Sequence, residues 1–80
     1  LIGLSDLAFD EGDYGEAIDY AERAVKLAAN NAGYHLRLGD GYFKVLRFAD
    51  ARREYDAAAA LGHPRARDRI DKLQSKLGEP

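Results

Sequence analysis

The sequence predicts an all-α protein whose five helices form hairpins that stack as a solenoid. Two features of the whole chain favour helices: alanine, leucine, arginine and acidic residues dominate it, and no segment alternates apolar and polar residues over the length of a strand. A third feature favours a repeat architecture, because similar residues recur at an interval of 34 positions. A chain of 80 residues is long enough for one small domain, expected over residues 1–80.

Two helices are expected before residue 32, with a turn between them. Leu4 and Leu7 suit a first helix, which the acidic, glycine-containing segment DEGDYGE interrupts. Asp13 precedes Glu16 by three residues, and this capping-box spacing predicts the start of a second helix. That helix is expected to stop at the paired asparagines 30 and 31. Its inward face is expected to carry Ala17, Ala21, Ala24, Val25 and Ala28.

Three more helices are expected in the rest of the chain. Helical spacing of apolar residues predicts a third helix over about 32–45 and a fourth over about 48–61. Gly62 suits the C-terminal cap of the fourth helix, and Pro64 suits the first turn of a fifth over about 64–77. The fifth helix carries an apolar stripe formed by Ala66, Ile70, Leu73 and Leu77.

The internal repeat is the strongest architectural signal. A shift of 34 residues superimposes small residues on small ones and large residues on large ones. The matched pairs include Leu4 with Leu38, Asp6 with Asp40, Phe9 with Phe43, Ala17 with Ala51 and Ala24 with Ala58. A helix–turn–helix unit that recurs at this interval indicates a helical solenoid, in which each hairpin buries its apolar face against the next.

The second unit of this repeat carries a specific motif. It contains Leu38-Gly39-x-x-Tyr42, followed by Ala51-x-x-x-Tyr55, Ala58 and Pro64. This pattern resembles the tetratricopeptide repeat, in which Leu-Gly-x-x-Tyr precedes an alanine, an aromatic residue, a second alanine and a proline. The resemblance implies a right-handed superhelix with one repeat over about 1–31, a second over about 32–65 and a capping helix over about 64–77.

The first unit departs further from the tetratricopeptide pattern than the second. Ser5 replaces the glycine, and Ala8 and Ala21 replace aromatic residues. In the second unit, His35 occupies the place of a tryptophan. Stacks of this kind usually need three or more units, and the chain contains no methionine. We therefore expect the sequence to be a piece of a larger protein.

The stretch LRLGDGYFK, residues 36–44, has two opposed interpretations. A loop that cradles a phosphate needs a preceding strand and a Gly-x-Gly-x-x-Gly or Gly-x-x-x-x-Gly-Lys pattern, and neither is present. We expect instead a helix in which Gly39 lies where paired helices cross, as do the small residues Ser5, Ala17 and Ala51. No corresponding role is apparent for Gly41.

Composition and charge disfavour several classes of function. The net charge is −2, and residues 1–30 carry seven acids but two bases, so a nucleic-acid-binding function is not expected. No apolar run approaches the roughly 20 residues of a membrane span. Cysteine is absent, which fits a reducing compartment, and a cytoplasmic location is expected.

No constellation of side chains predicts catalysis, a cofactor or a metal. The acidic segment at residues 10–16 lacks the ligand spacing of a calcium-binding loop. The two histidines have no neighbouring ligands in the sequence. Ser5 and Ser75 have no histidine and aspartate to activate them. We therefore expect a protein that is not an enzyme and needs no cofactor.

The tetratricopeptide resemblance implies that the first helix of each pair lines a concave face, which in that family grips a peptide or a partner helix. The matching positions here are Ile2, Asp6, Phe9, Asp10, Leu36, Arg37, Asp40, Phe43, Lys44, Arg67, Ile70, Asp71 and Gln74. Chaperone-binding members hold a terminal carboxylate with lysine and asparagine at such places. Because Ile2 and Leu36 replace lysine, and Asp6 and Asp40 replace asparagine, that clamp is not expected here.

The expected partner is a basic or amphipathic protein segment. Phe9 and Phe43 belong to a repeated apolar stripe, and Asp6 and Asp40 form a repeated acidic one. A groove with both stripes suits a segment that carries apolar anchors and lysine or arginine. The two phenylalanines can equally pack between neighbouring helices, so groove and core are both open for them.

A structural role is the alternative function. The acidic start and the basic segment over residues 65–76 suit head-to-tail stacking. Leu1, Leu4 and Leu7 form an apolar stripe on the first helix that another copy or a further repeat would cover. The module would then extend a longer array or form a homo-oligomer, with no peptide ligand of its own. The first expectation is an adaptor or scaffold that binds a partner on its concave face.

Overall fold

Five α-helices account for most of the chain that the computed structural model describes, residues 2–79. They are α1 (Ile2–Asp10), α2 (Tyr14–Leu27), α3 (Ala32–Lys44), α4 (Phe48–Ala60) and α5 (Ala66–Leu77), and these residues contain no strand. The prediction of an all-α protein with five helices is confirmed.

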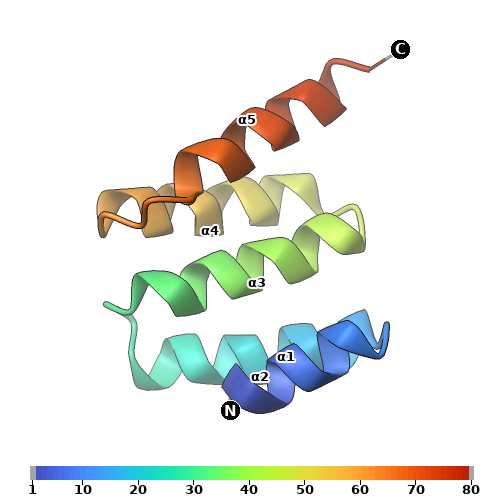
Figure 1. Ribbon diagram of the computed structural model, residues 1–80, viewed down its shortest axis with the longest axis vertical. Coiled ribbons are helices and arrows are strands. Elements are labelled where there is room, and N and C mark those ends of the chain that lie inside the picture. The colour runs from blue at the N-terminus through green and yellow to red at the C-terminus, as the bar shows by residue number, and fades with distance from the viewer. Residues whose placement is uncertain (1, 80) are drawn as a thin grey trace.

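The helices pack in chain order (Figure 1). α1 lies against α2 and α3 lies against α4, so each pair forms a hairpin. Contacts of α2 with α3 and of α4 with α5 join the hairpins and the last helix into one stack, with the two ends of the chain at its opposite ends. The right-handed superhelical twist that the resemblance implies stays a prediction.

Side-chain caps begin two of the helices. Asp13 Oδ1 accepts a hydrogen bond of 3.2 Å from the Glu16 N–H at the start of α2, as the capping-box spacing predicts. Asn31 Oδ1 accepts one of 3.1 Å from the Tyr34 N–H at the start of α3. Each cap satisfies a backbone donor that the first turn of a helix leaves without an intrahelical partner.

Two helix boundaries differ from the sequence expectation. α2 ends at Leu27, before the asparagine pair, because the next residue leaves the helical region with a φ of −147°. α5 begins at Ala66 rather than at Pro64. His63 Nδ1 accepts a hydrogen bond of 3.0 Å from the Arg65 N–H, and this contact holds the segment before Ala66 in a turn.

Small residues lie where the helices of each hairpin approach closely. A Cβ atom on Gly39 of α3 would lie 2.6 Å from Cε1 of Tyr55 in α4, so a larger residue would displace that ring. Ala51 of α4 is fully buried. In the first hairpin, the buried Ser5 donates a 2.8 Å hydrogen bond from its Oγ to the carbonyl oxygen of Ala17. The prediction of small, buried residues at the crossings is confirmed.

Gly41 also has a packing role, which the sequence did not reveal. A Cβ atom at this position would lie 2.8 Å from Cγ1 of Ile18 in α2. Residues two positions apart on a helix differ by about 200° of rotation, so Gly39 and Gly41 face roughly opposite ways. Gly39 therefore lets α3 approach α4, and Gly41 lets it approach α2 of the preceding hairpin.

One hydrophobic core extends from α2 to α5. Its buried members are Ile18, Ala21, Leu36, Leu38, Tyr42, Ala51, Tyr55, Ala58, Ala66, Ile70 and Leu73. The last three confirm most of the apolar stripe predicted for α5. Leu77, the fourth member of that stripe, is 58% exposed, because it lies in the last turn of α5, where this helix rises away from α4 (Figure 1).

His35 is buried and joins α3 to two other segments. Its Nδ1 lies 2.8 Å from Glu54 Oε1 on α4, and its Nε2 lies 2.6 Å from the carbonyl oxygen of Ala29 in the α2–α3 turn. Both partners accept hydrogen bonds, so the two contacts are made together only by the protonated imidazolium. Burial lowers the pKa of His35, but the hydrogen bonds and the charge of Glu54 outweigh burial and raise it above its usual value.

Candidate functional site

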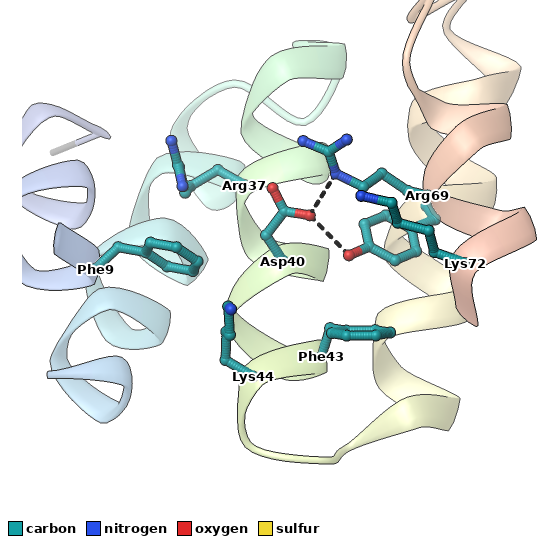
Figure 2. Close-up of a pocket in the computed structure, with 8 residues that line it drawn as sticks. Phe9, Arg37, Asp40, Phe43, Lys44, Arg69 and Lys72 are labelled. Atoms are coloured by element: carbon teal, nitrogen blue, oxygen red, sulfur yellow. Dashed lines mark hydrogen bonds and ion pairs between the residues drawn. The ribbon is translucent and has the colours of Figure 1, made fainter. Parts of the chain in front are cut away.

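A cavity of about 340 Å³ lies between α1, α3 and α5 (Figure 2). We call it the α1–α3–α5 pocket. Its lining consists of Phe9 from α1; Arg37, Asp40, Phe43 and Lys44 from α3; Tyr55 from α4; and Arg69 and Lys72 from α5. Both hairpins and the last helix therefore contribute to one site.

Asp40 is held by donors from two other helices (Figure 2). Tyr55 Oη donates a hydrogen bond of 2.7 Å to Asp40 Oδ1, and Arg69 Nε donates one of 3.0 Å to the same oxygen. Burial and the hydrogen bond to Asp40 raise the pKa of the Tyr55 phenol, which therefore keeps its proton and continues to donate. This carboxylate is part of the internal structure of the pocket wall.

Asp6, the repeat partner of Asp40, is also paired. Arg37 Nε lies 2.6 Å from Asp6 Oδ1, and this ion pair links α3 to α1. The same oxygen is buried and has no partner of good hydrogen-bond geometry within residues 2–79. The charge of Arg37 therefore offsets the cost of burying it. The Arg37 guanidinium carbon also lies 4.9 Å from the centre of the Phe9 ring, within cation–π range.

The two phenylalanines line the pocket and pack against neighbours at the same time. Phe9 meets Tyr14 edge-on with 5.3 Å between ring centres, and Phe43 meets Phe48 edge-on with 5.5 Å. Each phenylalanine is half-buried, and Phe43 also packs against the core cluster. Each ring therefore packs against its neighbours and also forms part of the pocket wall, so groove and core are not exclusive alternatives.

The pocket is rich in positive charge, although the chain as a whole carries −2. Two arginines and two lysines line it, and Asp40 is the single carboxylate among the lining residues. Arg37 and Arg69 already have partners. Lys44 and Lys72 are exposed, and neither forms an ion pair with another residue of the described range 2–79. The two lysines are thus the charges available to a ligand.

The predicted face divides into four groups in the structure. The residues that line the pocket are Phe9, Arg37, Asp40, Phe43 and Lys44. Leu36 instead belongs to the core, as does Ile70; Leu36 is 8% exposed and unavailable to a partner. Ile2 and Asp6 are half-buried on α1 outside the lining, and Asp6 reaches the pocket only through Arg37. The exposed residues outside the lining are Asp10, Arg67, Asp71 and Gln74.

The pocket residues of α5 differ from those that the 34-residue period selects. The face that the resemblance implies includes Arg67, Asp71 and Gln74, each of which directly follows a buried residue of the α5 stripe. A shift of 34 residues relates Asp71 to Arg37 and Gln74 to Asp40. Arg69 and Lys72, which line the pocket, each directly precede one. One residue is about 100° of rotation on a helix, so the two sets flank the buried stripe on opposite sides.

The reversal follows from the positions of the two helices around the pocket. In α3 the lining residues Arg37, Asp40 and Phe43 each follow a buried residue. α1 and α5 lie on opposite sides of α3 (Figure 2), and Arg69 and Lys72 extend from α5 toward α3, so the pocket-facing residues of α5 come before the buried ones. The signal that identifies Arg69 and Lys72 is therefore the buried stripe of α5, not the repeat. Tyr55, the remaining unpredicted lining residue, is a core residue whose hydroxyl reaches Asp40.

No model of a known protein family matches this chain, and no curated protein matches it. None of the helices within residues 2–79 has both the length and the apolar character that crossing a membrane requires. Over the same residues, no group of three or more histidine, cysteine, aspartate or glutamate side chains is placed to hold a metal ion.

Proposed function

We propose that the protein is a protein–protein interaction module, an adaptor or scaffold that holds a segment of a partner protein in the α1–α3–α5 pocket. The observation that carries this proposal is the presence in one cavity of two half-buried aromatic rings and two lysines that have no ion-pair partner among residues 2–79. Protein-binding sites concentrate their energy in aromatic and arginine side chains placed in partly enclosed pockets.

The size and location of the pocket support the same function. Its volume of about 340 Å³ lies at the small end of ligand sites and suits a few side chains of a peptide. The resemblance to tetratricopeptide proteins adds an expectation in the same direction, because the first helices of their repeats line the peptide-binding face. α1 and α3 are the first helices of the two hairpins in this chain.

Site-resolved crosslinking tests this proposal. The photoreactive residue p-benzoylphenylalanine replaces either Lys44 in the pocket or Ala59, an exposed residue of α4 outside the lining. After irradiation in a lysate of the cells that produce the protein, the Lys44 variant is expected to capture discrete partners that the Ala59 variant does not. Capture that is equal at the two positions, or absent at Lys44, contradicts the proposal.

A separate observation favours the second candidate, self-association through α1. Leu4 and Leu7 are 47% and 56% exposed on this helix. Apolar side chains that are exposed together mark an interaction surface. Leu1, the third leucine of the predicted stripe, lies outside the described residues. In this alternative a second copy or a further repeat covers α1, and the pocket needs no ligand.

Light scattering separates the two candidates. Self-association through α1 predicts a molar mass that rises with protein concentration in the wild type but not in a Leu4→Gln/Leu7→Gln variant. Leu77→Gln is the matched control, since Leu77 is similarly exposed but lies on α5. A wild-type mass that stays at the monomer value over the whole concentration range excludes this candidate.

A further inference from the structure

We propose that the α1–α3–α5 pocket selects an acidic segment of another protein, in which one aromatic or aliphatic side chain is flanked by aspartate or glutamate. This inference rests on the proposed binding function and specifies the chemistry of the partner. The sequence analysis expects a basic partner, which requires aspartates that are free to bind a cation. The partner inferred here is acidic instead.

The two aspartates of the repeated acidic stripe are committed to internal contacts. Asp40 Oδ1 already accepts hydrogen bonds from Tyr55 and Arg69. Asp6 is paired with Arg37. Each aspartate is therefore already neutralised by an arginine, and a lysine or arginine of a ligand would bring a further positive charge next to that arginine. The geometry therefore opposes a basic ligand at both positions.

The positive charges are the groups left available. Lys44 reaches into the pocket from α3 and Lys72 from α5 (Figure 2). Both are exposed and have no ion-pair partner within the described part of the chain, residues 2–79. Acidic side chains of a ligand can therefore pair with cations on two different helices without breaking an existing pair. Such complementarity determines partner choice and accelerates association.

The apolar anchor is argued from the aromatic lining. Phe9 and Phe43 are positioned by edge-on contacts with Tyr14 and Phe48, and both still line the cavity. A volume of about 340 Å³ accommodates an aromatic side chain, and aromatic rings favour offset or edge-on contact with each other. The apolar anchor of the ligand would contact the two phenylalanines, and its carboxylates would pair with the two lysines.

Selection from a random peptide library displayed on phage tests the inference without assuming a sequence. The wild-type protein is the bait, and the displayed peptides have no free C-terminus, so a terminal carboxylate does not contribute. Selected sequences are expected to be enriched in aspartate and glutamate next to an aromatic or aliphatic residue. Enrichment in lysine and arginine, or selection with no charge preference, overturns the inference.

The pocket is then tested directly with the most enriched acidic peptide, fluorescently labelled and amidated. Lys44→Glu/Lys72→Glu is expected to weaken binding about tenfold or more, as measured by fluorescence anisotropy. The control Lys26→Glu/Arg65→Glu makes the same change of charge at exposed residues outside the lining, and binding is expected to stay within about twofold of wild type. Lys44→Gln/Lys72→Gln replaces the reversal variant if circular dichroism shows that the latter is unfolded.

Equal losses of affinity in the pocket variant and the control variant contradict the inference, since they indicate attraction to the overall charge. The chain contains its own acidic, aromatic-flanked segment at residues 10–16, so sedimentation without peptide is also measured. A wild-type dimer that Lys44→Glu/Lys72→Glu abolishes would assign the pocket to a second copy and refute binding of another protein. If basic peptides are selected and Lys44 crosslinking still captures partners, the binding function stands and the acidic preference fails.

Discussion

Leu46 adopts a backbone conformation that residues with a side chain rarely take. Its φ is +65°, and it lies in the turn between α3 and α4. The residue 34 positions earlier, Gly12, has a φ of +81° in the turn between α1 and α2. The two hairpins therefore use the same left-handed turn, with a glycine in the first and a leucine in the second. The left-handed region costs a residue with a Cβ atom roughly 1–2 kcal/mol.

Leu46→Gly is expected to stabilise the protein by about 0.5–1 kcal/mol, because relief of this strain exceeds the added backbone entropy of glycine. The free energy of unfolding in urea measures the change. The reverse substitution in the first hairpin, Gly12→Leu, is the matched test. It is expected to destabilise by about 1 kcal/mol or more, although the space around Gly12 is open. Effects of the same sign in both variants contradict this explanation.

Gly39→Ala is expected to destabilise the protein by about 1–3 kcal/mol, because the new Cβ atom would lie 2.6 Å from the Tyr55 ring. The control is Gly15→Ala in α2, where nothing lies within 4 Å of the added atom. Alanine favours helix over glycine by up to about 1 kcal/mol, so this control is expected to be neutral or stabilising. The melting temperatures of both variants are measured: Gly39→Ala reports the effect of crowding, and Gly15→Ala reports that of helix propensity alone.

At the scale of helices, His35 connects elements that are separated in sequence. Its two ring nitrogens contact Glu54 of α4 and the α2–α3 turn at Ala29. Glu54 is itself mostly buried, and Arg53 Nε lies 3.8 Å from its other oxygen. The imidazolium therefore joins α3 to α4 within the second hairpin and to the turn that precedes it, and its protonation affects how these segments are held together.

The raised pKa of His35 predicts a pH-dependent stability. The folded state binds this proton more tightly than the unfolded state, whose histidine pKa is about 6.5. The stabilisation is thus complete below about pH 6.5 and is lost as the pH rises through the folded-state pKa. The melting temperature is expected to fall over that interval. Titration of the His35 ring protons by NMR measures the pKa, which is expected to decrease in Glu54→Gln. An unchanged pKa in Glu54→Gln contradicts the ion-pair explanation.

The helices and their packing faces were predictable because their signals are local. The capping spacing of Asp13 and Glu16, and the small residues Ser5, Ala17 and Gly39, depend on neighbours within one helix or one hairpin. The role of Gly41 was not predictable in the same way. Its contact, Ile18, lies in the preceding hairpin, and only the angle between hairpins brings the two together.

The candidate site was predictable in part for a related reason. Phe9, Phe43 and the α3 charges follow from the repeat, but the partners of Asp6 and Asp40 depend on how whole helices are rotated. Arg69 lies on the side of α5 that the 34-residue period does not select. The sequence therefore predicted Asp6 and Asp40 as acids of the face, but not that arginines from other helices neutralise them.

At the scale of the molecule, α5 closes one end of the core. It packs on α4 through Ala66, Ile70 and Leu73, and Leu73 is fully buried. Its outer surface is exposed and charged. The same helix contributes Arg69 and Lys72 to the pocket, so one element both covers the core and completes the candidate site.

Leu73→Ala is expected to lower the free energy of unfolding by about 2–5 kcal/mol, since it opens a cavity under a buried leucine. Leu77→Ala removes the same side chain from the same helix, but its leucine is 58% exposed. That control is expected to change stability by no more than about 0.5 kcal/mol. Urea denaturation compares the two variants, and similar losses would show that α5 does not close the core through Leu73.

The hydrogen bonds to Asp40 have a consequence for the motion of the last helix. Because Arg69 of α5 and Tyr55 of α4 share one oxygen of this carboxylate, detachment of α5 leaves the Asp40 carboxylate in the pocket wall with the tyrosine hydrogen bond but without the paired guanidinium. An occupant that bridges Lys44 and Lys72 would tie α5 to α3 and suppress such local opening, by the same mass action through which any ligand protects the state it binds. Slower exchange of the α5 amide hydrogens on ligand binding is the form this linkage would take.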